Sequence, residues 1–247
     1  MTPTPGTSTS LDTARKATRR IDHFVEHLQS AMRLARSWRV TLLLGLVALS
    51  ILSAISVQKT DALTAWESWL HLHFGYVLPL LCLALSFRAM SPCDDPSNAH
   101  FARIRLGADR LYLTLTNLGV VLVGSSAIGA ALLLLGRFLT RGTGEAVFLS
   151  DFAVCIGIGL IATATYIIFF SAMQRLGRGR TPAIVAFAFD LTVGHSDGAW
   201  ALFTPHRYLE EMLGSPGIFL VSARASSWIL LSIMLAGIGW IVARTRR

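Results

Sequence analysis

Charged side chains are scarce in this chain of 247 residues: Asp, Glu, Lys and Arg make up 15% of it, and hydrophobic residues make up 53%. Soluble domains usually carry about 25% charged residues. Cysteine is also rare, because the chain has only Cys82, Cys93 and Cys155. Three cysteines do not form a disulfide framework, and we expect unpaired thiols. The composition therefore favours an integral membrane protein over a soluble or disulfide-stabilised domain.

The motifs of several enzyme classes are missing as well. No G-x-x-x-x-G-K-[ST] segment occurs, so the chain has no P-loop for ATP. His23, Glu26 and His27 follow the inverted zinc-protease order H-x-x-E-H on one helix face, but no further ligand is evident nearby. The adjacent Glu210 and Glu211 lack the Arg that membrane-embedded CAAX-type proteases need, so we expect a solvated helix face. We assign no catalytic residue and no metal ligand, and we expect that the chain is not an enzyme.

Long apolar runs dominate what is present. A hydrocarbon core of about 30 Å needs about 20 helical residues, and in lipid the backbone must satisfy its own hydrogen bonds. Six runs approach or exceed this length: Val40–Val57, Leu70–Phe87, Leu111–Leu135, Phe152–Met173, Pro182–Trp200 and Ala225–Val242. The sequence therefore predicts an all-α integral membrane protein with six transmembrane helices.

Basic residues concentrate in alternate gaps between these runs. Of the 22 Lys and Arg residues, 17 lie before the first run, after the second, after the fourth and in the tail. The positive-inside rule then places both termini in the cytoplasm. We expect the membrane to be a cell membrane, the bacterial inner (plasma) membrane. The net charge of +8 is better explained by anionic lipid headgroups than by nucleic acid, so we expect a lipid partner and no nucleic-acid partner.

The region before the first run divides into two parts. Residues 1–20 are rich in Pro, Thr and Ser and predict a disordered cytosolic tail. Residues 21–38 place apolar side chains at helical spacing on one face and predict an amphipathic helix lying on the membrane. A soluble amphipathic helix packed on a partner is the alternative. Residues 21–247 are expected to form a single transmembrane domain.

The first two runs are joined by a short predicted outer loop, residues 58–69. Trp66 and Trp69 in this loop are expected to anchor the chain at the membrane interface. His71 and His73 follow near the outer end of the second run. Two residues on a helix point about 200° apart, so these histidines cannot easily share a metal ion, and we interpret them as interfacial.

The fifth run, residues 182–200, contains the acidic residue Asp190. A regular helix would hold this carboxylate near the middle of the membrane, where it is costly. We therefore predict a short or broken helix, and the alternative is that Asp190 faces a polar cavity. Together with His195, Asp197 and His206 it could form an acid–base cluster, but polar residues that cap a broken helix explain the same pattern and are favoured.

A short helix is expected between the fifth and sixth runs, at the outer surface. Thr204 is the predicted N-cap, Pro205 takes the first helical position and Gly214 ends the helix.

The layout of the whole chain resembles the permeases of type 2 ATP-binding-cassette (ABC) exporters. The segments that carry the resemblance are IDHFVEHLQSAMRLARSW, FARIRLGADRLYLTLTN and FTPHRYLEEMLG. In that family they correspond to an interfacial N-terminal helix, a cytosolic loop between spans two and three, and a short outer helix between spans five and six.

The resemblance implies a pathway-forming subunit of an exporter, driven by a separate cytosolic ATPase. ATP and Mg²⁺ would bind to that ATPase, with no cofactor on this chain, and two copies, or this chain and a paralogous permease, would form the pathway. Asp190 and His195 are candidates for the outer gate. The candidate residues for ATPase docking are Arg103, Arg105, Asp109 and Arg110.

Three other functions remain open. An integral membrane scaffold could recruit a cytosolic partner without transport. A membrane-embedded enzyme is less compatible with the missing motifs. A self-contained secondary transporter would usually show internal repeats, and no convincing duplication relates spans one to three to spans four to six.

Overall fold

The computed structural model describes residues 38–57, 62–90, 109–140, 149–177, 180–196, 198–213 and 222–246. The predicted tail 1–20 and all of the predicted interfacial helix except Trp38 lie outside these ranges. The chain divides into two compact units, Met1–Leu42 and Leu43–Arg247. The packing described below is that of the second unit.

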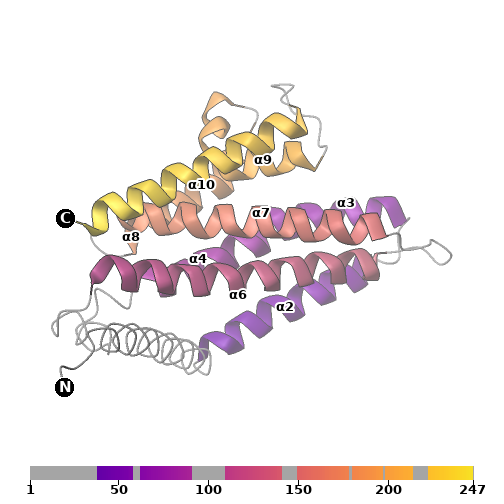
Figure 1. Cartoon of the computed structure of the whole chain (residues 1–247). Coiled ribbons are helices and arrows are strands. Elements are labelled where there is room, and N and C mark those ends of the chain that lie inside the picture. The colour runs from indigo at the N-terminus through magenta and orange to yellow at the C-terminus, as the bar shows by residue number, and fades with distance from the viewer. Residues whose placement is uncertain are drawn as a thin grey trace, which may run out of the picture. The chain divides into compact units, whose positions relative to one another are not determined.

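All regular elements in the described ranges are helices, as the apolar runs predict (Figure 1). In chain order they are α2 (Trp38–Val57), α3 (Ala62–Leu72), the π-helical turn η1 (His73–Val77), α4 (Leu78–Met90), α6 (Arg110–Leu139), α7 (Leu149–Gln174), α8 (Thr181–Val193), the 3₁₀ turn η3 (Ala199–Phe203), α9 (Pro205–Met212) and α10 (Ala223–Thr245).

Four stretches are long and apolar enough to cross a membrane: Thr64–Met90, Arg110–Leu139, Phe152–Gln174 and Ala223–Thr245. They correspond to the second, third, fourth and sixth predicted spans, and they identify the chain as a candidate multi-pass membrane protein. The apolar parts in the first and fifth runs are shorter helical stretches, Gly45–Ile55 and Thr181–Val193.

The second apolar helix begins earlier than the run of hydrophobic residues predicts. Helix α3 starts at Ala62, so Trp66 and Trp69 lie on a helix and not in a loop. The expectation of an interfacial anchor is wrong for Trp69, which is 2% exposed. Its ring stacks on His73 at 4.7 Å between centroids, and its indole N–H donates to the carbonyl of Ser50. His73 is also buried within the bundle, and is therefore not interfacial.

One widened turn, η1, joins α3 to α4. The backbone N–H of Leu78 donates to the carbonyl of His73, five residues back. Pro79 follows at once and has no N–H to offer to the carbonyl of Gly75, four residues before it. A wider turn is a usual response to such an interruption, and single π turns often occur near functional sites.

Helices α6 and α7 lie side by side and form the most closely packed pair (Figure 1). A Cβ added at Gly159 would lie 2.8 Å from the Cα of Ala130, and one added at Gly129 would collide with the Thr163 hydroxyl. Small residues allow such close approach of helices in lipid. Helix α7 also contacts α4, α8, α9 and α10, and its buried Tyr166 belongs to the central core.

Candidate functional site

Helix α8 ends at Val193, which confirms the prediction of a short helix, and the chain turns at Gly194. The turn is tight, because a Cβ added at Gly194 would lie 2.9 Å from the Cβ of His206. After the turn, η3 and α9 pack against α8. The structure therefore returns the chain toward the bundle at the point where the sequence places its polar interruption.

Helix α9 begins at Pro205, as predicted, but Thr204 does not cap it through its side chain. The Thr204 hydroxyl donates instead to the carbonyl of Ala201, over 2.7 Å. The cap comes from α8: the backbone N–H of His206 donates to Oδ1 of Asp190 over 3.2 Å. Asp190 is 2% exposed, and its carboxylate satisfies one of the free amides at a helix start. Gly214, the predicted end, lies outside the described residues, and the last helical residue is Met212.

The polar side of α9 is buried, so the expectation of a solvated face at Glu210 and Glu211 is wrong for Glu211. Arg207 and Glu211 form an ion pair at 3.2 Å, and both side chains are almost fully buried. The hydroxyl of Ser226, on α10, donates to Oε2 of Glu211 over 3.0 Å. Hydrogen bonds to its remaining atoms help a buried pair of charges to be tolerated, and here the bond from Ser226 also joins α9 to α10.

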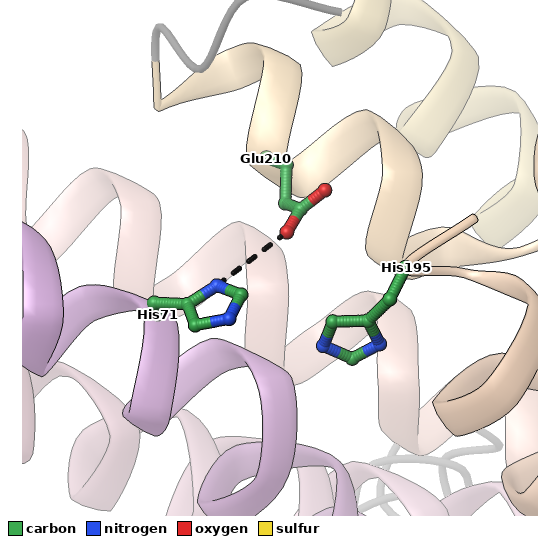
Figure 2. A group of neighbouring side chains, drawn as sticks. All are labelled: His71, His195 and Glu210. Atoms are coloured by element: carbon green, nitrogen blue, oxygen red, sulfur yellow. Dashed lines mark ion pairs between the residues drawn. The ribbon is translucent and has the colours of Figure 1, made fainter. Parts of the chain in front are cut away.

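A cluster of imidazole and carboxylate groups lies on the other side of α9. One ligand atom each from His71, His195 and Glu210 can be chosen so that all three lie within 4.8 Å of one another. Figure 2 shows His71 on α3 facing Glu210 on α9, with His195 beside them. Nδ1 of His71 lies 3.7 Å from Oε1 of Glu210. Helix α3 thus meets, at one point, two nearby segments that lie more than 120 residues further along the chain.

His206 contacts two members of this cluster, Glu210 and His195. Its Nε2 lies 3.0 Å from Oε1 of Glu210, and its ring stacks on that of His195 with 4.0 Å between centroids. Nδ1 of His195 lies 2.9 Å from the carbonyl of Leu191. A carbonyl only accepts hydrogen bonds, so this contact assigns the proton to Nδ1 and leaves a lone pair on Nε2. Nε2 of His195 is buried and has no hydrogen-bond partner among the described residues.

Burial and neighbouring charges oppose each other in their effect on the pKa of Glu210, whereas burial and the charge of His206 act together on the pKa of His195. Burial by itself would raise the pKa of Glu210, but the contact with His206 and the charges of His206, His195 and His71 outweigh it and hold that pKa below its usual value. Burial, followed by the charge of His206, lowers the pKa of His195. The cluster therefore favours an ionised carboxylate beside a neutral His195, which are the forms that bind metal ions.

The predicted site residues fall in three places. Asp190 caps α9, and His195 belongs to the cluster. Asp109 caps α6 by accepting a hydrogen bond from the N–H of Leu111 over 2.9 Å, and the adjacent Arg110 is exposed. Arg103 and Arg105 lie outside the described residues, as does Asp197.

Sequence reasoning missed the contributions of His71 and Glu210. It compared His71 only with His73, and the structure confirms that these two point apart, because His73 is buried while the side chain of His71 is 60% exposed. The partner of His71 comes from α9, and no local spacing could reveal that pairing. The signal that was present is the density of His and acidic residues in residues 190–211.

A shallow apolar groove of about 500 Å³ lies elsewhere, between α6, α7 and α10. Its lining is apolar except for the hydroxyl of Ser126, and no titratable side chain contributes to it. The groove offers no chemistry comparable to that of the cluster.

Comparison with known proteins assigns no relative: no protein-family model, no curated protein sequence and no solved structure matches this chain.

Proposed function

We propose that the chain is the membrane-spanning subunit of an ABC exporter of the type 2 layout and forms the substrate pathway for a separate ATPase. The observation that carries the proposal is the shape of the α8–α9 region. An apolar helix of 13 residues stops short, and an eight-residue helix with a buried polar side then packs against α7, α8 and α10. This is the short-helix element that the resemblance predicts between spans five and six.

In the proposed topology, α2 and α8 complete a set of six spans with the four long helices. The 20 residues of α2 suffice for a bilayer. The 13 residues of α8 do not, and η3 and α9 then follow it at the outer surface of the membrane. Helix α9 is held there by protein contacts, because His206, Arg207, Leu209 and Glu211 are all buried against the bundle. Both termini lie in the cytoplasm, and α9 lies on the outer side.

A second copy of this chain, or a paralogous permease, completes the pathway. Helix α10 exposes large apolar side chains, with Trp228 at 64% and Leu235 at 63%. Such side chains suit either lipid or another transmembrane helix. The exposed face of α10 is therefore available to the bilayer and to a partner permease.

The ATPase docks at the cytosolic loop before α6. The candidate contacts are Arg103, Arg105, Asp109 and Arg110, and the cap at Asp109 joins this loop directly to the start of α6. Binding of ATP and Mg²⁺ to the ATPase shifts the permease between inward- and outward-facing states, provided that the loop contacts the ATPase differently in the two states. Asp190 and His195 are the candidate outer-gate residues.

Purification of the tagged chain from its native membranes in a mild detergent tests this function. We expect a P-loop ATPase to co-purify and the double variant R103E/R105E to lose it. The matched control is R246E, which reverses an exposed charge on the same side of the membrane. Recovery of a partner without a nucleotide-binding motif would support the scaffold alternative. An ATPase that binds R103E/R105E and the control equally would refute the docking contact.

A further inference from the structure

We propose that His71, His195 and Glu210 bind one divalent transition-metal ion of the zinc class, at a site that links α3 to the α8–α9 region. The donor atoms are of the right chemical type, because imidazole nitrogen and carboxylate oxygen are common ligands of Zn²⁺. Calcium and magnesium ions prefer oxygen ligands throughout, so a set with two imidazoles disfavours both.

The ring of His195 is already held in the orientation and tautomer that a metal-binding histidine needs. A ligating histidine usually donates its other ring N–H to a carbonyl or a carboxylate, which selects the tautomer and holds the ring. His195 directs Nδ1 to the carbonyl of Leu191, and its Nε2 is buried with no hydrogen-bond partner in the described part of the chain. The stacked ring of His206 prevents His195 from turning freely.

Glu210 is oriented in a similar way. The contact between Oε1 and Nε2 of His206, at 3.0 Å, holds the carboxylate on the side of α9 that faces α3. His206 is therefore a positioning residue. Gly75 lies next to His195 and leaves space beside its Nε2. A Cβ at this position would lie only 3.0 Å from that atom.

The adjustment needed for an ion is small and falls on the most exposed of the three residues, His71. Zinc lies about 2.0–2.2 Å from nitrogen and oxygen ligands, so donors in a tetrahedral site lie about 3.4 Å apart. The three donors lie within 4.8 Å of one another, and the side chain of His71 is 60% exposed, so its ring can rotate inward. Three protein ligands leave the fourth position of the ion to water or to an anionic ligand.

The site does not depend on the transport function proposed above. It connects the start of the second apolar helix to the segment that follows the fifth, so a bound ion would stabilise the folded state in proportion to its occupancy. In the proposed topology the site opens on the outer side.

Metal binding is measured on the full chain, purified with an affinity tag that contains no histidine. The variant H23A/H27A serves as the parent, because it removes the H-x-x-E-H segment as a competing site. The protein is stripped with a chelator and dialysed against Zn²⁺, and bound zinc is counted by mass spectrometry. We expect one Zn²⁺ per chain and a rise in melting temperature with added Zn²⁺. Co²⁺ in place of Zn²⁺ should give the visible absorption of a tetrahedral site.

H71A and E210Q in this parent should each weaken Zn²⁺ binding by about tenfold or more, and should reduce the rise in melting temperature at a given Zn²⁺ concentration. H71A changes an exposed side chain and should leave the metal-free melting temperature unchanged. E67Q, at an exposed position on the same helix, is the matched control and should bind Zn²⁺ like the parent. The proposal is overturned if the parent binds no Zn²⁺, or if H71A binds it as tightly as E67Q does. Neither outcome bears on whether an ATPase co-purifies.

Discussion

Oδ1 of Asp190 accepts a hydrogen bond from the backbone N–H of His206 over 3.2 Å, so a carboxylate of one helix caps the start of another. A cap of this kind contributes about 1 kcal/mol, and the negative charge also complements the helix dipole. We predict that D190A lowers the melting temperature in detergent, whereas D190N, which keeps an acceptor oxygen, lowers it less. D109A removes the exposed cap of α6 and serves as the comparison. If D190A and D190N melt alike, the cap is not what Asp190 contributes.

The ion pair of Arg207 and Glu211 makes a second prediction about α9. Removing one member of a buried pair leaves an uncompensated charge and costs about 3–5 kcal/mol, whereas replacing both by apolar residues is often close to neutral. E211Q and R207M should therefore each lower the melting temperature more than R207M/E211L does. A double variant that is less stable than both single variants would show that the pair does not act as a unit.

The contact between α6 and α7 offers a matched pair of glycines. A Cβ at Gly159 would press on the backbone of Ala130, whereas one at Gly157 meets nothing within 4 Å. Overpacking of this kind costs about 1–3 kcal/mol, so G159A should melt at a lower temperature and G157A should not. The close approach of the two helices would be contradicted by equal melting of G159A and the unchanged protein.

Gly75 provides a test of the metal site that alters none of its ligands. A methyl group there meets Nε2 of His195 at 3.0 Å, so the ring of His195 must shift by a few tenths of an ångström at its donor atom. We predict that G75A weakens Zn²⁺ binding by about tenfold, in the range seen when residues that support ligands are changed. G45A, at a glycine with open space around it, should bind Zn²⁺ normally. Normal Zn²⁺ binding by G75A would contradict the prediction that the space beside Gly75 is needed to keep His195 in its binding position.

Hydrophobic runs predicted the helices because a chain in lipid has few other ways to form hydrogen bonds with its backbone N–H and C=O groups. They predicted the boundaries less well. Helix α3 begins before the run does, since Trp66 and Trp69 pack on the bundle and extend the helix. The polar interruption at Asp190 predicted the early end of α8 correctly, because a buried carboxylate requires a partner. The partner itself, an amide on α9, depends on how the chain folds back.

The cluster could not be predicted from local spacing. The region of His195, His206 and Glu210 is rich in titratable groups, and reading it as capping residues accounts only for Asp190. His71 comes from a helix far away in sequence, and only the packing of α9 against η1 brings it near. Glu210 and Glu211 are adjacent yet differ in role, because consecutive residues on a helix point about 100° apart.

The proposed topology is tested most directly by labelling single cysteines in intact cells. Cys82, Cys93 and Cys155 are first replaced, and one cysteine is then introduced at Trp200, which is 68% exposed in η3, or at Arg246, which follows α10. A membrane-impermeant maleimide should label W200C in intact cells and R246C only after the membrane is permeabilised. Labelling of R246C in intact cells, or protection of W200C until permeabilisation, would contradict the proposed topology. The pathway, the docking loop and the outer position of the metal site all depend on that topology.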